Sequence, residues 1–97
     1  MTKAEALARL RAREGELRAM GVDHLSIFGS TARDEATSES DLDLAIQLQP
    51  GVATGLAFFG LLEDISLLLG GAVDIVTEPT RTARLQAEID RDRVRVF

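Results

Sequence analysis

The sequence predicts a small α/β (α+β) domain in which a mixed β-sheet is flanked by helices. Short segments that alternate apolar and polar residues, which are typical of strands, take turns with longer amphipathic or apolar segments, which are typical of helices. The chain has 97 residues, enough for one hydrophobic core but not for two. We therefore expect residues 1–97 to form a single domain.

Three long segments have the pattern of helices. In the first, Lys3–Met20, one stripe is apolar and Gly21 provides a stop; the stripe consists of Leu7, Leu10, Leu17 and Met20. The second, Thr54–Leu69, is apolar on most sides. It is either a buried central helix or a surface for a partner. The third helix is expected over Arg81–Arg91, where the arginines form either a solvated face or a contact for a polyanion or an acidic partner.

Four segments have the pattern of strands: Asp23–Phe28, Asp41–Leu48, Ala72–Thr77 and Val94–Phe97. The second alternates strictly, so that its aspartates share one face and its larger apolar residues share the other, namely Leu42, Leu44, Ile46 and Leu48. Together with the helices, the element order is α-β-(α)-β-α-β-α-β. This order predicts one mixed sheet covered by helices.

Composition excludes several classes of function. The 16 acidic and 11 basic residues give a formal net charge of −5, which argues against direct binding of nucleic acid. The chain has no cysteine and a single histidine, His24, so disulfides, thiolate chemistry and the usual zinc sites are not expected. No apolar run is long enough to span a bilayer, and the first residues do not resemble a signal peptide. We expect a cytoplasmic protein that does not bind membranes.

Two acids, Asp41 and Asp43, occupy positions i and i+2 of a predicted strand. This spacing places both carboxylates on the same face, a few ångströms apart, where their charges repel. A divalent cation relieves the repulsion, and Mg²⁺ favours one or two carboxylates combined with substrate phosphates and water. Two such ions can stabilise the attacking and the leaving oxygen of a phosphoryl displacement. The pair therefore indicates a magnesium site on a rigid element.

Gly29 and Ser30 follow the preceding strand. A glycine there lets a phosphate approach the backbone, free N–H groups at a helix start favour anions, and the serine hydroxyl can donate to a phosphate oxygen. Either motif alone is common and carries little weight. Their combination, separated by ten residues in a strand–turn–strand setting, is far more specific.

The combined motif, Gly29-Ser30-x₁₀-Asp41-x-Asp43, resembles the signature of the DNA polymerase β-like nucleotidyltransferase superfamily. Within it, the chain resembles the minimal nucleotidyltransferases, the MntA-like antitoxins of HEPN-type toxins. The resemblance implies a nucleotidyltransferase fold, ATP as donor and two Mg²⁺ ions. It also implies that the two aspartates bind metal, that Gly29 and Ser30 hold the triphosphate, and that a third acid on a later strand completes the site and helps to deprotonate the acceptor hydroxyl.

Asp74 is the candidate for this third acid, because it is the one acid in a strand rich in Val and Ile, where a buried, unpaired carboxylate is costly unless a metal or a second charge lies nearby. Its alternative is an exposed strand end without catalytic function. Arg33 either reaches a phosphate or pairs with Asp34, Glu35 or the acids of the site. Ser40 either orients the first aspartate, as part of the nucleotide site, or caps a turn. Asp34 stands where the family usually has glycine, and aspartate tolerates the left-handed conformation better than most residues.

These observations lead to one main hypothesis on function and two alternatives. The main hypothesis is a nucleotidyltransferase that transfers AMP from ATP to a hydroxyl of a cognate HEPN-type toxin, most plausibly that of a tyrosine, and so acts as an antitoxin; the resemblance supplies the acceptor. The first alternative is a non-catalytic antitoxin that neutralises its partner by binding. The second is a nucleotidyltransferase for a small molecule, which would need a second copy to build its pocket.

Overall fold

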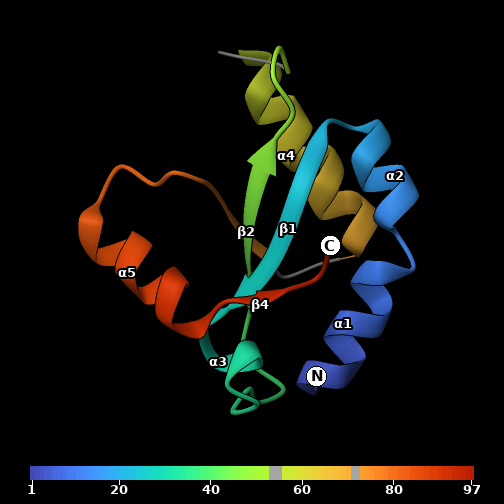
Figure 1. The fold of residues 1–97 in the computed structure, drawn as a ribbon. Coiled ribbons are helices and arrows are strands. Elements are labelled where there is room, and N and C mark those ends of the chain that lie inside the picture. Colours follow the sequence, from blue (N-terminus) through green and yellow to red (C-terminus); the bar gives the residue numbers. More distant parts are fainter. Residues whose placement is uncertain (53–55, 71–72) are drawn as a thin grey trace.

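Residues 1–52, 56–70 and 73–97 are described by the computed structural model (Figure 1). Within them, four strands form one mixed sheet in the order β3-β2-β1-β4. Their bounds are Val22–Phe28 (β1), Leu42–Leu48 (β2), Val73–Thr77 (β3) and Val94–Arg95 (β4). β2 and β3 run parallel, whereas β1 is antiparallel to both of its neighbours, β2 and β4. The prediction of a mixed sheet is confirmed.

Helices cover both faces of this sheet (Figure 1). α1, α2 and α4 lie on one face, α5 lies on the other, and the short α3 follows β1 directly. Their bounds are Lys3–Arg11 (α1), Glu14–Ala19 (α2), Gly29–Ala32 (α3), Leu56–Leu69 (α4) and Ala83–Asp92 (α5). The prediction that helices flank the sheet is confirmed, and α5 differs from the expected Arg81–Arg91 by one or two residues at each end.

The alternation along β2 divides the core into two layers. Leu44 and Ile46 are fully buried in the larger cluster, which also includes residues of α1, α2 and α4. Ala45 points to the other face, where it packs with Ile89 of α5. Because side chains alternate along a strand, Asp43 shares the α5 face with Ala45. The apolar layer thus anchors β2 on one side while the acid projects from the other.

The single helix expected over Lys3–Met20 is wrong, because the chain breaks at Ala12 and Arg13 into α1 and α2. Arg13 has φ −103° and ψ 8°, outside helical values. The break lets Leu10 and Leu17 both reach the same buried cluster. Gly15, exposed within α2, lowers helix propensity just beyond the break.

α4 matches neither of the two alternatives expected from the sequence completely, since it is partly buried and partly exposed. Ile65 is buried and several leucines pack partly against the sheet, but Phe59 and Leu67 remain 66% and 72% exposed. The expected beginnings of this helix at Thr54 and of the third strand at Ala72 fall outside the described residues. No helix in the described ranges combines the length and the apolar character that crossing a bilayer requires.

Candidate active site

Three strands bring the site together at one end of the sheet. Asp43 on β2 pairs in register with Asp74 on the parallel β3 and, on its other side, with Phe28 at the end of β1. Gly29 and Ser30 come directly after Phe28 and begin α3. Because register partners project from the same face, the two carboxylates lie beside each other, next to the turn that follows β1.

Gly29 is required where it stands. Its φ of +70° lies in the left-handed region, and a Cβ atom there would collide with the Oδ2 atom of Asp43. A larger residue would therefore strain the backbone and push the carboxylate aside. The sequence predicted a glycine for the approach of a phosphate, whereas the structure shows that it also makes room for the acid.

Burial and neighbouring charge both act on Asp43. Desolvation, followed by the negative charges of Asp74 and Asp41, raises the pKa of its carboxyl group above the usual 3.8, and the charge of Arg33 opposes the rise. Asp41 is exposed and lies just before β2 rather than within it. Asp74 is also exposed. The argument from its burial therefore does not hold, and its candidacy depends on its register with Asp43.

An open hollow of about 540 Å³ lies over these residues, on the α5 face of the sheet. Its lining combines residues of the β1–α3 turn, the two strand aspartates and one side of α5. The lining residues are Phe28, Gly29, Ser30, Arg33, Asp43, Asp74, Val76, Leu85, Glu88, Arg91 and Asp92. Five of the seven residues proposed from the sequence thus line one hollow, while Asp41 and Ser40 are outside this lining.

The contribution of α5 was missed by sequence reasoning. The side chain of Asp92, at the end of α5, is only 6% exposed and accepts hydrogen bonds from Arg33 at 2.6 Å and Arg91 at 3.2 Å. These hydrogen bonds, that of Arg91 first, lower the pKa of Asp92. Arg33 also pairs with Glu35 at 3.2 Å. Of the two roles left open for Arg33, the structure shows the pairing with acidic side chains. In the sequence, the cluster of arginines within Arg81–Arg91 was the one feature that could have indicated that α5 contributes to the site.

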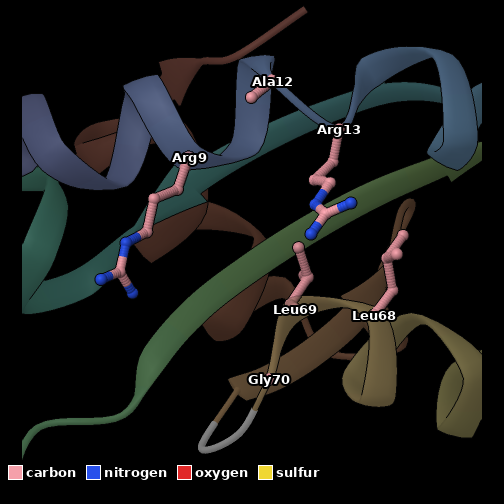
Figure 2. Close-up of a pocket in the computed structure, with 6 residues that line it drawn as sticks. All are labelled: Arg9, Ala12, Arg13, Leu68, Leu69 and Gly70. Atoms are coloured by element: carbon pink, nitrogen blue, oxygen red, sulfur yellow. The ribbon is translucent and has the colours of Figure 1, made fainter.

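Ser40 caps a turn. Its hydroxyl oxygen accepts a hydrogen bond from the backbone N–H of Thr37 at 3.0 Å, and it lines a different hollow together with Leu42. Figure 2 shows a further hollow on the opposite side of the sheet, which Arg9 and Arg13 line together with the end of α4, and where Arg13 extends towards Leu69. The three aspartates are not among the described residues that line it.

Asp34, which replaces the usual glycine, fits the turn. Its φ is +60°, in the left-handed region, and its Oδ1 atom accepts a hydrogen bond from the backbone N–H of Lys3 at 3.0 Å. The aspartate thereby connects the turn after α3 to the beginning of α1. The geometry of the motif is kept, and the added carboxylate stabilises the first turn of a neighbouring helix.

The donor set suits a hard cation such as Mg²⁺. Asp43 and Asp74 offer adjacent carboxylate oxygens, and burial together with the charges of Asp74 and Asp41 raises the pKa of Asp43. In the described part of the chain, no three His, Cys, Asp or Glu side chains are grouped closely enough to hold an ion by themselves. The site therefore fits a cation that is shared with substrate phosphates.

Comparison with known proteins agrees with this geometry. The model of the nucleotidyltransferase domain family matches residues 7–96. The protein adenylyltransferase MntA of Thermococcus cleftensis is 32% identical over 97 residues, which are 99% of this chain and 97% of that protein. A solved structure assigned as a minimal nucleotidyltransferase is 34% identical, with a TM-score of 0.74 over 97% of this chain and 95% of that chain.

A crystal structure of a toxin–antitoxin complex with AMP-PNP shares the fold, with a TM-score of 0.70 and 18% identity over 90% of this chain and 72% of that chain. The family model and the full-length relative both cover nearly the whole chain. The chain therefore belongs to the nucleotidyltransferase family and is a nucleotidyltransferase of the minimal, MntA-like type.

Proposed function

We propose that the chain is a Mg²⁺-dependent protein adenylyltransferase that transfers AMP from ATP to a tyrosine hydroxyl of a HEPN-type toxin, and so acts as an antitoxin in the cytoplasm. The observation that carries the proposal is that Asp43 and Asp74 pair in register on neighbouring strands and that Gly29, directly after β1, lies against Asp43. The name of the Thermococcus relative and the AMP-PNP complex with the same fold support the reaction and the donor.

The donor nucleotide occupies the open hollow. Gly29 and Ser30 lie where the backbone and a hydroxyl can bind the triphosphate. Arg91 and Arg33 line the same hollow, but both are paired with Asp92, so phosphate binding competes with that carboxylate. When bound, Mg²⁺ supplies charge neutralisation of the phosphates; Asp43 and Asp74, with Asp41 beside them, are the residues that would hold it.

Asp74 is placed to receive the proton of the acceptor hydroxyl, because it is exposed and lies at the outer side of the carboxylate pair. The hydroxyl oxygen forms a bond to the α-phosphorus of ATP, the bond from that phosphorus to the bridging oxygen breaks, and pyrophosphate leaves. Positioning and charge stabilisation supply most of the rate in such transfers.

The acceptor tyrosine belongs to another protein, because these 97 residues contain no tyrosine. The toxin–antitoxin complex with AMP-PNP supports a toxin as the partner. That the toxin is of the HEPN type and that the acceptor is a tyrosine are inferred from the resemblance of the motif with Asp41 and Asp43 to the minimal nucleotidyltransferases.

A second candidate function is neutralisation by binding alone. Leu67 on α4 is a large apolar side chain that is 72% exposed, as expected of a contact for another protein. In that case the carboxylates would be dispensable for neutralisation.

The test is an assay with ATP labelled in its α-phosphate, Mg²⁺ and, as the proposed toxin, the protein encoded by the gene next to that of this chain. We expect label on the toxin, with a mass increase of one or more AMP groups at a tyrosine. Asp41→Asn/Asp43→Asn should reduce the transfer by at least about 100-fold, since even residues that only support metal ligands contribute about 10–100-fold.

The matched control is Glu63→Gln/Asp64→Asn, which removes the same charge from the exposed side of α4 and should transfer AMP normally. Absence of label, combined with a carboxylate variant that still binds and silences the toxin, would refute the catalytic proposal in favour of binding alone.

A further inference from the structure

β3 forms one edge of the sheet and exposes part of its backbone. Just past its end, the N–H of Glu78 donates to the carbonyl of Ile46 on β2 at 2.8 Å. In a parallel ladder, alternate residues of a strand bond to the same neighbour. Asp74 and Val76 therefore bond to β2, whereas Ile75 and Thr77 direct their N–H and C=O groups to the open edge.

A groove of about 320 Å³ runs along this edge. Phe58 and Leu62 of α4 line it from one face of the sheet, and Val76 and Leu85 line it from the other. An added strand would thus find apolar side chains on both of its faces, and between them the N–H and C=O groups that Ile75 and Thr77 direct away from β2.

The groove adjoins the hollow of the candidate active site, because Val76 and Leu85 line both. Asp74 belongs to the same strand, two positions before Val76. A segment that pairs with β3 would therefore lie beside Asp74, the residue proposed to receive the proton of the acceptor hydroxyl.

We propose that an extended segment of the acceptor protein adds to β3 as a fifth strand and thereby presents its tyrosine beside Asp74. This inference rests on the proposed transfer to a protein hydroxyl and specifies how the acceptor binds. It assigns β3 and the groove beside Phe58 to acceptor recognition.

The geometry favours tyrosine over serine or threonine. A residue opposite Asp74 on the added strand projects from the same face, towards the hollow. Neighbouring strands are about 4.8 Å apart, so Asp43 lies two strand spacings from the added strand. A serine hydroxyl ends beside Asp74, whereas the longer tyrosine side chain extends past Asp74 towards Asp43 and the donor.

A second copy of the chain is a poorer occupant of this edge. Pairing of two β3 strands would bring two Asp74 carboxylates to one junction between molecules that each carry a net charge of −5. Arg81 lines the groove beyond the end of β3, so an acidic side chain at that end of the acceptor segment complements it.

The test uses two adjacent aromatic residues of α4. Phe58 is half-buried in the groove and packs edge-to-face on Phe59, which is 66% exposed and does not line it. Phe58→Lys should raise the KM for the toxin protein by about tenfold or more, as expected for loss of an aromatic anchor. The kcat and the KM for ATP should not change, and Phe59→Lys should behave as the unaltered chain.

Amide hydrogen exchange, without ATP, provides a readout that does not depend on catalysis. In the free chain, the amides of Asp74 and Val76 should already exchange slowly, and those of Ile75 and Thr77 should exchange fast. The toxin protein should slow the latter two strongly. Thr77→Pro, which removes an outward N–H without breaking the ladder to β2, should weaken toxin binding as Phe58→Lys does.

The outcomes separate this inference from the proposed function. AMP transfer with unchanged exchange at Ile75 and Thr77 would overturn strand addition and leave the adenylyltransferase intact, whatever the KM of the Phe58 variant. Slowed exchange without any AMP transfer would refute the reaction but retain the docking edge. Concentration-dependent protection of the two amides in the free chain would assign the edge to a second copy and overturn the proposal.

Discussion

At the scale of single residues, the ionised carboxylate of Asp43 suits a cation site but destabilises the folded chain. Desolvation and the charges of Asp74 and Asp41 raise the pKa of its carboxyl group, so the folded chain favours the protonated form. Ionisation of Asp43 therefore lowers the free energy of unfolding as the pH rises through the range above 3.8. A bound cation would reverse this effect by pairing with the carboxylate.

We predict that Asp43→Asn raises the Tm of the chain at about pH 7 in the presence of EDTA, because it removes this unfavourable ionisation. The difference should shrink as the pH falls and Asp43 becomes protonated in the unaltered chain. Thermal unfolding measured from about pH 3 to pH 7 checks the prediction. Asp64→Asn, at an exposed position on α4, is the control. A Tm below that of the unaltered chain at about pH 7 would contradict it.

The sequence predicted which residues form this site, but it did not always predict the structural reason for each of them. The glycine at position 29 was expected for a phosphate, and its contact with Asp43 became visible only when β1 and β2 were paired. Asp74 was expected to be buried and is exposed. Its register with Asp43 joins residues 31 positions apart, and local periodicity carries no information on such pairings.

At the scale of elements, one ion pair anchors α5 over the site. Arg93, just after α5, donates to both carboxylate oxygens of Glu78, at 2.8 and 2.5 Å, and to the buried hydroxyl of Ser26 at 3.0 Å. The side chain of Glu78 is 6% exposed, and the hydrogen bond from Arg93 is the main cause of its lowered pKa. This pair ties the end of α5, where Asp92 holds two arginines, to β1 and β3.

We predict that Glu78→Gln lowers the free energy of unfolding at about pH 7 by about 1.5–3 kcal/mol, the usual contribution of a hydrogen bond to a charged group. Because the folded pKa of Glu78 is lowered, its contribution is present above the ordinary value of 4.5 and is lost as the pH falls through the folded pKa. Urea unfolding of both chains at several pH values measures this difference. A destabilisation that stays constant down to about pH 2 would show that charge is not its cause.

The elements themselves were largely predictable, because alternation and helical periodicity are local properties of the sequence. The break between α1 and α2 was not, since Leu10 and Leu17 fit one helical stripe as well as they fit two helices on one core. The place of α5 over the active site was also hidden. Its arginines were visible in the sequence, but the buried position of Asp92 depends on the packing of Ile89 against Ala45.

At the scale of the whole molecule, charge determines whether the hollow can bind ATP, the proposed donor. The chain carries a net charge of −5, and the described lining of the hollow contains the acids Asp43, Asp74, Glu88 and Asp92 against the bases Arg33 and Arg91. Both arginines are paired with Asp92. A free triphosphate therefore meets net negative charge, and a divalent cation is needed to make the contact favourable.

We predict that ATP raises the Tm of the chain only when Mg²⁺ is present. At a concentration about 100 times the dissociation constant, a ligand stabilises the folded state by about 2.7 kcal/mol, and for a domain of this size that amounts to about 10–20 °C in Tm. Thermal unfolding with ATP, with Mg²⁺ and with both measures the effect. Glu63→Gln/Asp64→Asn should respond as the unaltered chain does, whereas Asp41→Asn/Asp43→Asn should lose the shift. An equal shift with ATP in EDTA would mean that Arg33, Arg91 and the turn at Gly29 bind the triphosphate by themselves, and the carboxylates would then need another role.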